Sequence, residues 1–180
     1  MTAIRWHRTV YGIVKGQRAL SILVLLAIAA VLRTRAQSVA GPSIEYRNKK
    51  FGFCFSLPAS WKGYLIVVSQ WGGVEPPGSQ NVVKGPLLRV RHPGWTEQDP
   101  YEDIPIMVFT QKQWQLVKGD KLDASGAAPF PPSELGHNAR YVFALPPRFD
   151  YDFLAGYQEV ESLIRQKSLH TPCGMHASGQ

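Results

Sequence analysis

Hydrophobic and polar positions alternate strictly from residue 51 to residue 57. Phe51, Phe53, Phe55 and Leu57 fall on one side of this stretch, and small or polar residues fall on the other. An alternation with a period of two that includes aromatic residues predicts a β-strand, and Pro58 ends it. We therefore expect a half-buried strand whose aromatic face packs on the core.

Several later segments carry strand or helix patterns, separated by loops rich in Gly and Pro. Further strands are predicted, in chain order, at residues 65–68, 86–92, 104–110 and 140–145. Loops are predicted at residues 72–78 and, as a long irregular segment, at residues 119–134. A short helix is expected at residues 111–118, and a longer one from about residue 151 to residue 169.

Strands in succession followed by one substantial helix indicate an α+β fold, in which an antiparallel sheet is flanked by helices. The patterns place two sets of residues in one shared core, namely Phe53, Phe55 and Leu57 from the first strand and Tyr157, Val160 and Ile164 from the last helix. With 44% hydrophobic residues in a chain of 180, one domain of ordinary size has enough apolar side chains for such a core.

The first 41 residues have the layout of a secretory signal. A basic stretch at residues 5–18 precedes an apolar run at residues 19–32 and a region of small residues at 36–41. The run is shorter than the roughly 20 residues that span a bilayer, which favours a cleaved signal peptide. An uncleaved anchor in the inner membrane and a buried soluble helix are the alternatives. Export to the periplasm or the cell exterior is expected.

The formal net charge of +7 belongs mostly to this leader. Residues 1–36 hold six Lys and Arg residues and no acid, so the rest of the chain holds 14 basic and 13 acidic residues. A nearly neutral domain argues against nucleic acid as a partner. The sequence therefore divides into a signal peptide or anchor (1–36), a linker (37–45), one α+β domain (46–169) and a flexible tail (170–180). Only the N-terminal segment is expected to contact a membrane.

The stretch from Tyr46 to Tyr64 carries a resemblance to a known family. Its pattern includes Phe51-Gly52-Phe53-x-Phe55-x-Leu57-Pro58 and Ser60-Trp61-Lys62-Gly63-Tyr64. It resembles the opening strand and turn of bacterial exported proteins with a PsbP-like fold, and weaker similarities extend to about residue 169. The resemblance implies an α/β/α sandwich with a central antiparallel sheet. Roles within that fold class are binding and scaffolding, and no functional residue is carried over.

Residue patterns that announce a reaction are missing. The sequence contains no nucleophile elbow, phosphate-binding loop, zinc-protease helix or dinucleotide fingerprint. An enzyme would have to assemble its site from distant residues, and a hydrolase-like site using Asp99, Asp103 and His137 is the alternative hypothesis. The acids Asp99, Glu102 and Asp103 match no calcium-binding loop, so a solvated loop is favoured. No cofactor is expected.

Aromatic residues near the predicted loops suggest binding instead. Four of them, Trp71, Trp95, Tyr101 and Trp114, are candidates for contacts with a partner. The competing interpretation is that each covers part of a small sheet, because Trp is usually buried. The leading hypothesis is a non-enzymatic binding or accessory module of the cell envelope that contacts a protein or an envelope polymer.

Near the C-terminus, His170, Cys173 and His176 are spaced by three residues. Their side chains suit zinc or copper, but a fourth ligand is missing, so an unstructured tail is the favoured interpretation. Cys54 and Cys173 are the only cysteines. In an oxidising compartment they are candidates for a disulfide, provided that their Cα atoms come within about 7 Å.

Overall fold

A computed structural model describes residues 43–126, 128–147, 149 and 152–173. The chain divides into two compact units, residues 1–40 and 41–180, and all the described residues belong to the second unit. The predicted leader, its apolar run at 19–32 and His176 lie outside the described residues. No helix among the residues described has the length and apolar character that crossing a membrane requires.

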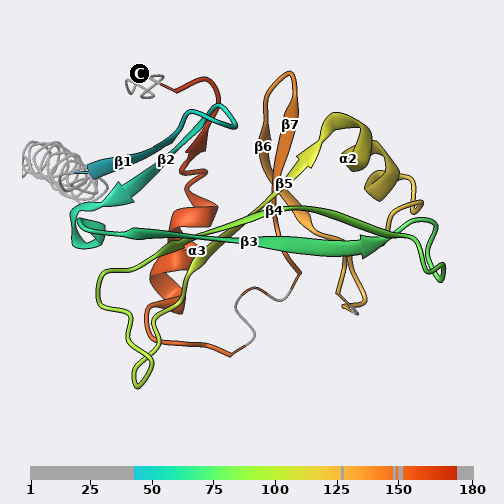
Figure 1. Cartoon of the computed structure of the whole chain (residues 1–180). Helices are drawn as coiled ribbons and strands as arrows, with labels where there is room; N and C mark the ends of the chain where they lie inside the picture. Colours follow the sequence, from blue (N-terminus) through green and yellow to red (C-terminus); the bar gives the residue numbers. More distant parts are fainter. Residues whose placement is uncertain (1–42, 127, 148, 150–151, 174–180) are drawn as a thin grey trace, which may run out of the picture. The chain divides into compact units, whose positions relative to one another are not determined.

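Two antiparallel sheets form this unit (Figure 1). The three-stranded sheet has the order β1-β2-β8, with β1 at Ser43–Asn48, β2 at Phe53–Pro58 and β8 at Leu169–His170. The five-stranded sheet has the order β3-β4-β5-β7-β6, and its strands are β3 at Leu65–Val74, β4 at Val82–Arg91, β5 at Ile104–Thr110, β6 at Ser133–His137 and β7 at Tyr141–Leu145. The helical segments are η1 at Ala59–Trp61, α2 at Gln111–Lys118 and α3 at Tyr157–Arg165. The α+β class is confirmed, with two sheets in place of the single sheet expected.

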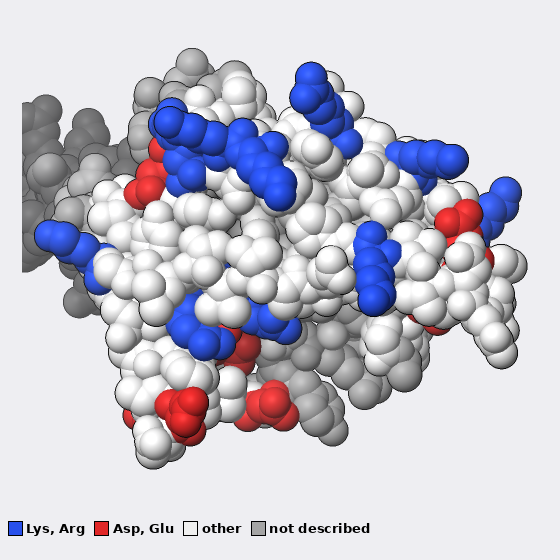
Figure 2. All heavy atoms as spheres, in the orientation of Figure 1, with Lys and Arg blue, Asp and Glu red and all other residues white. Residues whose placement is uncertain are grey.

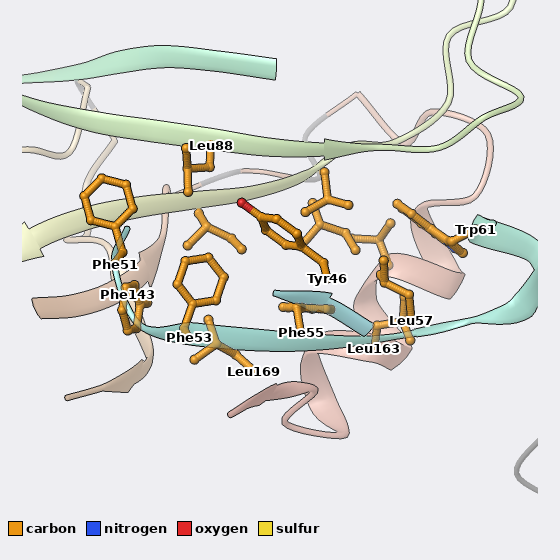
Figure 3. Packing of buried hydrophobic residues seen from close by; sticks show 14 of the residues in the cluster. Tyr46, Phe51, Phe53, Phe55, Leu57, Trp61, Leu88, Phe143, Leu163 and Leu169 are labelled. Carbon is orange, nitrogen blue, oxygen red and sulfur yellow. The ribbon is translucent and has the colours of Figure 1, made fainter. Parts of the chain in front are cut away.

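One hydrophobic core lies between the two sheets and includes α3. Phe53, Phe55 and Leu57 of β2 have at most 1% of their surface exposed, and Val160 of α3 is fully buried with them. Figure 3 shows Phe53 and Leu88 pointing toward one another across this core. The predicted contact between β2 and the last helix is therefore present for Val160.

The other two helix residues expected in that core are placed differently. Ile164 is partly buried at the edge of the cluster. The Tyr157 ring instead packs edge-on against the exposed Phe153 ring, with 5.2 Å between the centroids. This difference arises because α3 begins only at Tyr157, after Gly156 in the left-handed region (φ 79°), so Tyr157 occupies the first turn.

The second core covers the opposite face of the five-stranded sheet. It is built from residues of α2, including Trp114, and from strand residues on that face, including Trp71 and Phe109. The helix begins with a capping box, in which the Thr110 hydroxyl accepts from the Gln113 backbone N–H and the Gln113 side chain accepts from the Thr110 backbone N–H. This local signal explains why the predicted and observed bounds of α2 coincide.

Three short strands were not predicted from the sequence. β1 begins at Ser43 inside the expected linker, β6 contains a bulge between Glu134 and Gly136, and β8 is two residues long. Because β8 pairs with β2, the tail boundary expected at residue 170 is too early. None of these strands has a hydrophobic alternation long enough to be recognised without its pairing partner.

Strand β3 extends through the glycines that predicted a loop at 72–78. Trp71 lies opposite Gly85 of β4, and a Cβ atom at Gly85 would come 2.4 Å from the Trp71 ring. The absence of a side chain at Gly85 therefore makes room for the indole. The loop is consequently shorter than expected, because pairing with β4 continues through Gly72 and Gly73 to Val74.

Candidate binding site

A cavity of about 440 Å³ lies against one face of the five-stranded sheet. Another part of the same face is covered by α2. The floor of the cavity comes from β4 and β5, and its walls come from the segments that follow β4 and β7. Its polar and aromatic lining residues are Arg89, Arg91, Trp95, Tyr101, Asp103 and the buried Glu102, and four prolines and two apolar side chains complete the lining. The site thus combines flat hydrophobic surfaces with arginine side chains.

Arg91 links the charged and aromatic parts of the cavity. Its Nε and Nη2 atoms donate to the two carboxylate oxygens of Asp103 over 3.1 and 2.9 Å. The guanidinium carbon lies 3.9 Å from the centre of the Trp95 ring. The hydrogen bonds that Arg91 donates to Asp103 raise the pKa of Arg91, so the guanidinium stays charged while it stacks on the indole. Trp95 is thereby held in one orientation although it is half-exposed.

Tyr101 is fixed from three sides. Its hydroxyl donates to Glu159 of α3 over 2.7 Å, and its ring stacks on His92 with 4.0 Å between the centroids. A Cβ atom at Gly156 would come 2.0 Å from the Tyr101 ring, so the ring packs directly on that glycine. Burial and the Glu159 carboxylate raise the pKa of Tyr101 to about 12. The phenol is therefore neutral at physiological pH.

Arg89 is the arginine of the cavity that makes no ion pair with Asp103. Its Nη1 atom donates to the Ser69 hydroxyl over 2.7 Å. Within the part of the chain that the structure describes, Arg89 forms no ion pair with an acidic side chain. Its guanidinium therefore retains donors for an acidic group brought by a ligand.

The four predicted binding aromatics are divided between this cavity and the second core. Trp95 and Tyr101 both line the cavity. Trp71 and Trp114 are only 4% and 5% exposed, so they present almost no surface to a partner. Trp71 stacks on Phe109 and donates to the Val108 carbonyl over 2.9 Å. For these two residues, the structure corrects the binding hypothesis in favour of the covering role.

Comparison with models of protein families, with curated proteins and with solved structures gives no match.

The residues of the hydrolase hypothesis are not assembled into one site. Asp103 lines the cavity and is neutralised by Arg91. His137 lines a separate groove of about 760 Å³ between β6, α3 and β8, where its Nδ1 atom lies 2.6 Å from the Glu134 carboxylate. The two hollows share no lining residue, and Asp99 lines neither. The general acid and base that a hydrolase needs are thus apart in the described part of the molecule.

The C-terminal metal candidates have other contacts. Cys173 forms a disulfide with Cys54, with 5.2 Å between the Cα atoms, so its sulfur is not available as a thiolate ligand. The Nε2 atom of His170 lies 2.9 Å from the Ser56 hydroxyl. His176 is outside the described residues, and those that are described contain no cluster of three His, Cys, Asp or Glu with the geometry to hold a metal ion.

Sequence reasoning missed the two arginines of the cavity, although a signal was present. Arg89 and Arg91 alternate on one face of the strand predicted at 86–92, and Trp95 follows four residues later. Two cations on one strand face, with an aromatic residue and an acid nearby in sequence, fit two interpretations. One is a binding site, and the other is a strand face exposed to solvent. Only the pairing of β4 with β5, which places Asp103 next to Arg91, distinguishes these two possibilities.

Proposed function

We propose that this protein is an exported, non-enzymatic binding module of the cell envelope, and that it binds a protein or an envelope polymer in the cavity of Trp95 and Tyr101. The observation that carries the proposal is Arg91 held between the Asp103 carboxylate and the Trp95 ring. A flat aromatic side chain that is already immobilised loses little conformational entropy when a ligand covers it.

The chemistry of the cavity narrows the ligand. Trp95 and Tyr101 supply ring surface for an apolar or flat group, and Arg89 supplies hydrogen-bond donors and a positive charge. A ligand that fits both carries an acidic group beside a planar or apolar one. An acidic side chain of a protein and an acidic substituent of an envelope polymer both meet this requirement.

The cellular location is proposed from two features. The basic, apolar and small segments of residues 1–41 follow the order of a secretory signal. The disulfide between Cys54 and Cys173 agrees with an oxidising compartment such as the periplasm or the exterior. We further infer a PsbP-like sandwich, and a central antiparallel sheet with apolar packing on both faces supports it.

A photo-reactive amino acid at position 95 of the full-length chain, expressed in the organism of origin, tests the binding role. We expect irradiation to yield one heavier adduct, whose captured ligand mass spectrometry identifies. The same group at position 130 is the control, because Phe130 is 49% exposed and does not line this cavity. No adduct from position 95, or the same adducts from both positions, contradicts the proposal.

A charge substitution tests the expected acidic group. Arg89→Gln should reduce the yield of the adduct from position 95 about tenfold, because a charge-assisted hydrogen bond contributes on the order of 1.5 kcal/mol. Lys84→Gln is the matched control, since it removes one charge from the same strand at an exposed position that does not line the cavity. An equal loss from both variants would indicate a general charge effect, and no loss from Arg89→Gln would exclude an acidic ligand at this arginine.

A further inference from the structure

The outer edge of β3 is an open edge of the five-stranded sheet. β3 is the first strand in the order β3-β4-β5-β7-β6, and its ten residues pair with β4 on one side only (Figure 1). An edge strand presents backbone N–H and C=O groups that another strand can satisfy. Which of these groups point outward follows from a contact at the end of the strand.

Val74 identifies the outward-facing residues. Its N–H and C=O groups bond to the Asp123 carbonyl and N–H over 2.9 and 3.0 Å, so they point away from β4. In an antiparallel ladder, both backbone groups of every second residue point to the same side. The pairing of β3 with β4 continues without a register shift. The residues whose backbone groups face outward are therefore Ile66, Val68, Gln70 and Gly72.

These four residues have no backbone hydrogen bond on that side within the described part of the chain. The segment at 123–124 closes only the far end of the strand, where a Cβ atom at Gly73 would lie 2.5 Å from the Asp123 carbonyl oxygen. From Ile66 to Gly72, the edge offers a row of donors and acceptors long enough to pair with a strand of ordinary length.

Between Ile66 and Gly72, the edge carries no charged residue, proline or bulge, the features that often protect an edge strand. Residues 65–74 contain no charged residue and no proline, and their pairing has no bulge. Leu65 and Val68 are 62% and 69% exposed, so large apolar side chains flank the unpaired backbone. Proteins that stay monomeric normally place lysine, proline or a bulge on such a strand.

We propose that this edge binds the same edge of a second copy of the chain, so that β3 and its counterpart pair antiparallel across a twofold axis. Antiparallel pairing of identical strands is self-complementary, as the closed interface of a symmetric dimer requires. An uncharged strand offers no charge pattern to select a different partner. The surface is distinct from the cavity described above, because no residue from 65 to 74 lines that cavity, although Ser69 accepts a hydrogen bond from Arg89.

The contacts of β3 favour a register with Val68 on the twofold axis. Val68 then pairs with Val68 of the other chain, which covers the most exposed of the large apolar side chains on the strand. In the same register, Ile66 exchanges backbone hydrogen bonds with Gln70 of the other chain. Ser69 lies off the axis in this register, which keeps the two Arg89 guanidinium groups from facing each other. Figure 2 shows both basic and acidic side chains on one face of the molecule, with the basic ones more numerous.

Cysteine cross-linking of the full-length chain in detergent tests the interface and its register. Both native cysteines are consumed in the disulfide, so an added cysteine is the only free thiol. We expect Val68→Cys to form a covalent dimer on mild oxidation, because Cα atoms in a hydrogen-bonded antiparallel pair are about 5.5 Å apart, which suits a disulfide. Val82→Cys is the control, since Val82 is 58% exposed but does not belong to the edge strand.

Two proline variants separate loss of the dimer from loss of the fold. Val68→Pro removes an outward N–H, so the molecular mass by light scattering should fall from two chains to one while the melting temperature of the disulfide-intact protein changes little. Val67→Pro removes an N–H that points to β4, so it should lower the melting temperature by several degrees.

A wild-type chain that is monomeric at 100 μM, or equal cross-linking from positions 68 and 82, overturns the proposal. So does a wild-type dimer that persists in a folded Val68→Pro variant, since another surface would then hold the two chains together. If the full chain is monomeric but cross-links to a different protein from position 68, the edge pairs with a foreign strand and the second-copy assignment is wrong.

Discussion

Cys54 of β2 and Cys173 are joined by a disulfide bond, although 119 positions separate them in the sequence. The bond lies beside the pairing of β8 with β2, in which His170 is opposite Cys54 and Leu169 is opposite Phe55. A segment that composition alone assigns to a loose tail is thus fixed to the strand that carries the centre of the core.

Replacing Cys173 with Ser should lower the free energy of unfolding by about 2 to 5 kcal/mol. The main reason is that the unfolded chain gains freedom when a loop of this length opens. Chemical denaturation of the wild type and the variant measures the difference. In the denatured but unreduced wild type, alkylation should label no thiol, and two freely alkylated thiols would contradict the disulfide.

Phe55→Ala should destabilise the protein by about 3 to 5 kcal/mol, because Phe55 is fully buried between the sheets and its removal leaves a cavity. Phe130→Ala is the matched control, since the same side chain is lost from a half-exposed position. We expect the control to stay within about 1 kcal/mol of the wild type. Equal melting temperatures for the wild type and Phe55→Ala would reject the core described above.

Gly156→Ala should cost more than Gly78→Ala, although both glycines have almost the same backbone conformation, with φ of 79° and 80°. At Gly78, nothing lies within 4 Å of an added Cβ atom, so only the left-handed conformation is penalised, by about 1 kcal/mol. At Gly156, the added Cβ also collides with the Tyr101 ring, which raises the expected cost to about 2 to 4 kcal/mol. Thermal unfolding of both variants measures the difference, and equal costs would contradict the packing of Tyr101.

The stability of the protein should fall between about pH 10 and pH 12 through Tyr101. The pKa of Tyr101 is raised to about 12 by burial and by Glu159, whereas a tyrosine in the unfolded chain titrates near 10. The folded protein therefore keeps a proton that the unfolded chain releases, and the stabilisation present below pH 10 is lost as the pH rises through 12. In titrations of phenolate absorbance, the difference between the wild type and Tyr101→Phe should have its midpoint near 12. A midpoint near 10 would contradict the described environment of Tyr101.

We expect the mature protein to begin between about Gln37 and Gly41, because small residues follow the apolar run at 19–32. Amino-terminal sequencing of the protein from its native cells measures the cleavage site. Recovery of intact Met1 in the membrane fraction would instead support the uncleaved anchor.

Local patterns determined the elements whose residues carry their own signal. The alternation from Phe51 to Leu57 predicted β2, and the run ending at Thr110 predicted β5 with α2 directly after it. These predictions succeeded because strand periodicity and helix capping depend on neighbours within a few residues. Composition likewise placed six of the 20 basic residues and no acid in residues 1–36 and left the remainder of the chain nearly neutral.

The tertiary structure decided which residues meet. Trp71 and Trp95 look alike in the sequence, yet Trp71 is buried beside Gly85, whereas Trp95 stacks under Arg91 in an open cavity. His137 and Asp103, both plausible catalytic groups, line separate hollows. The physical reason is that strands distant in the sequence pair with one another. This pairing decides which elements cover each sheet face and which side chains form ion pairs. The sequence determined the five strands that have a clear periodicity, while pairing between strands decided which side chains meet.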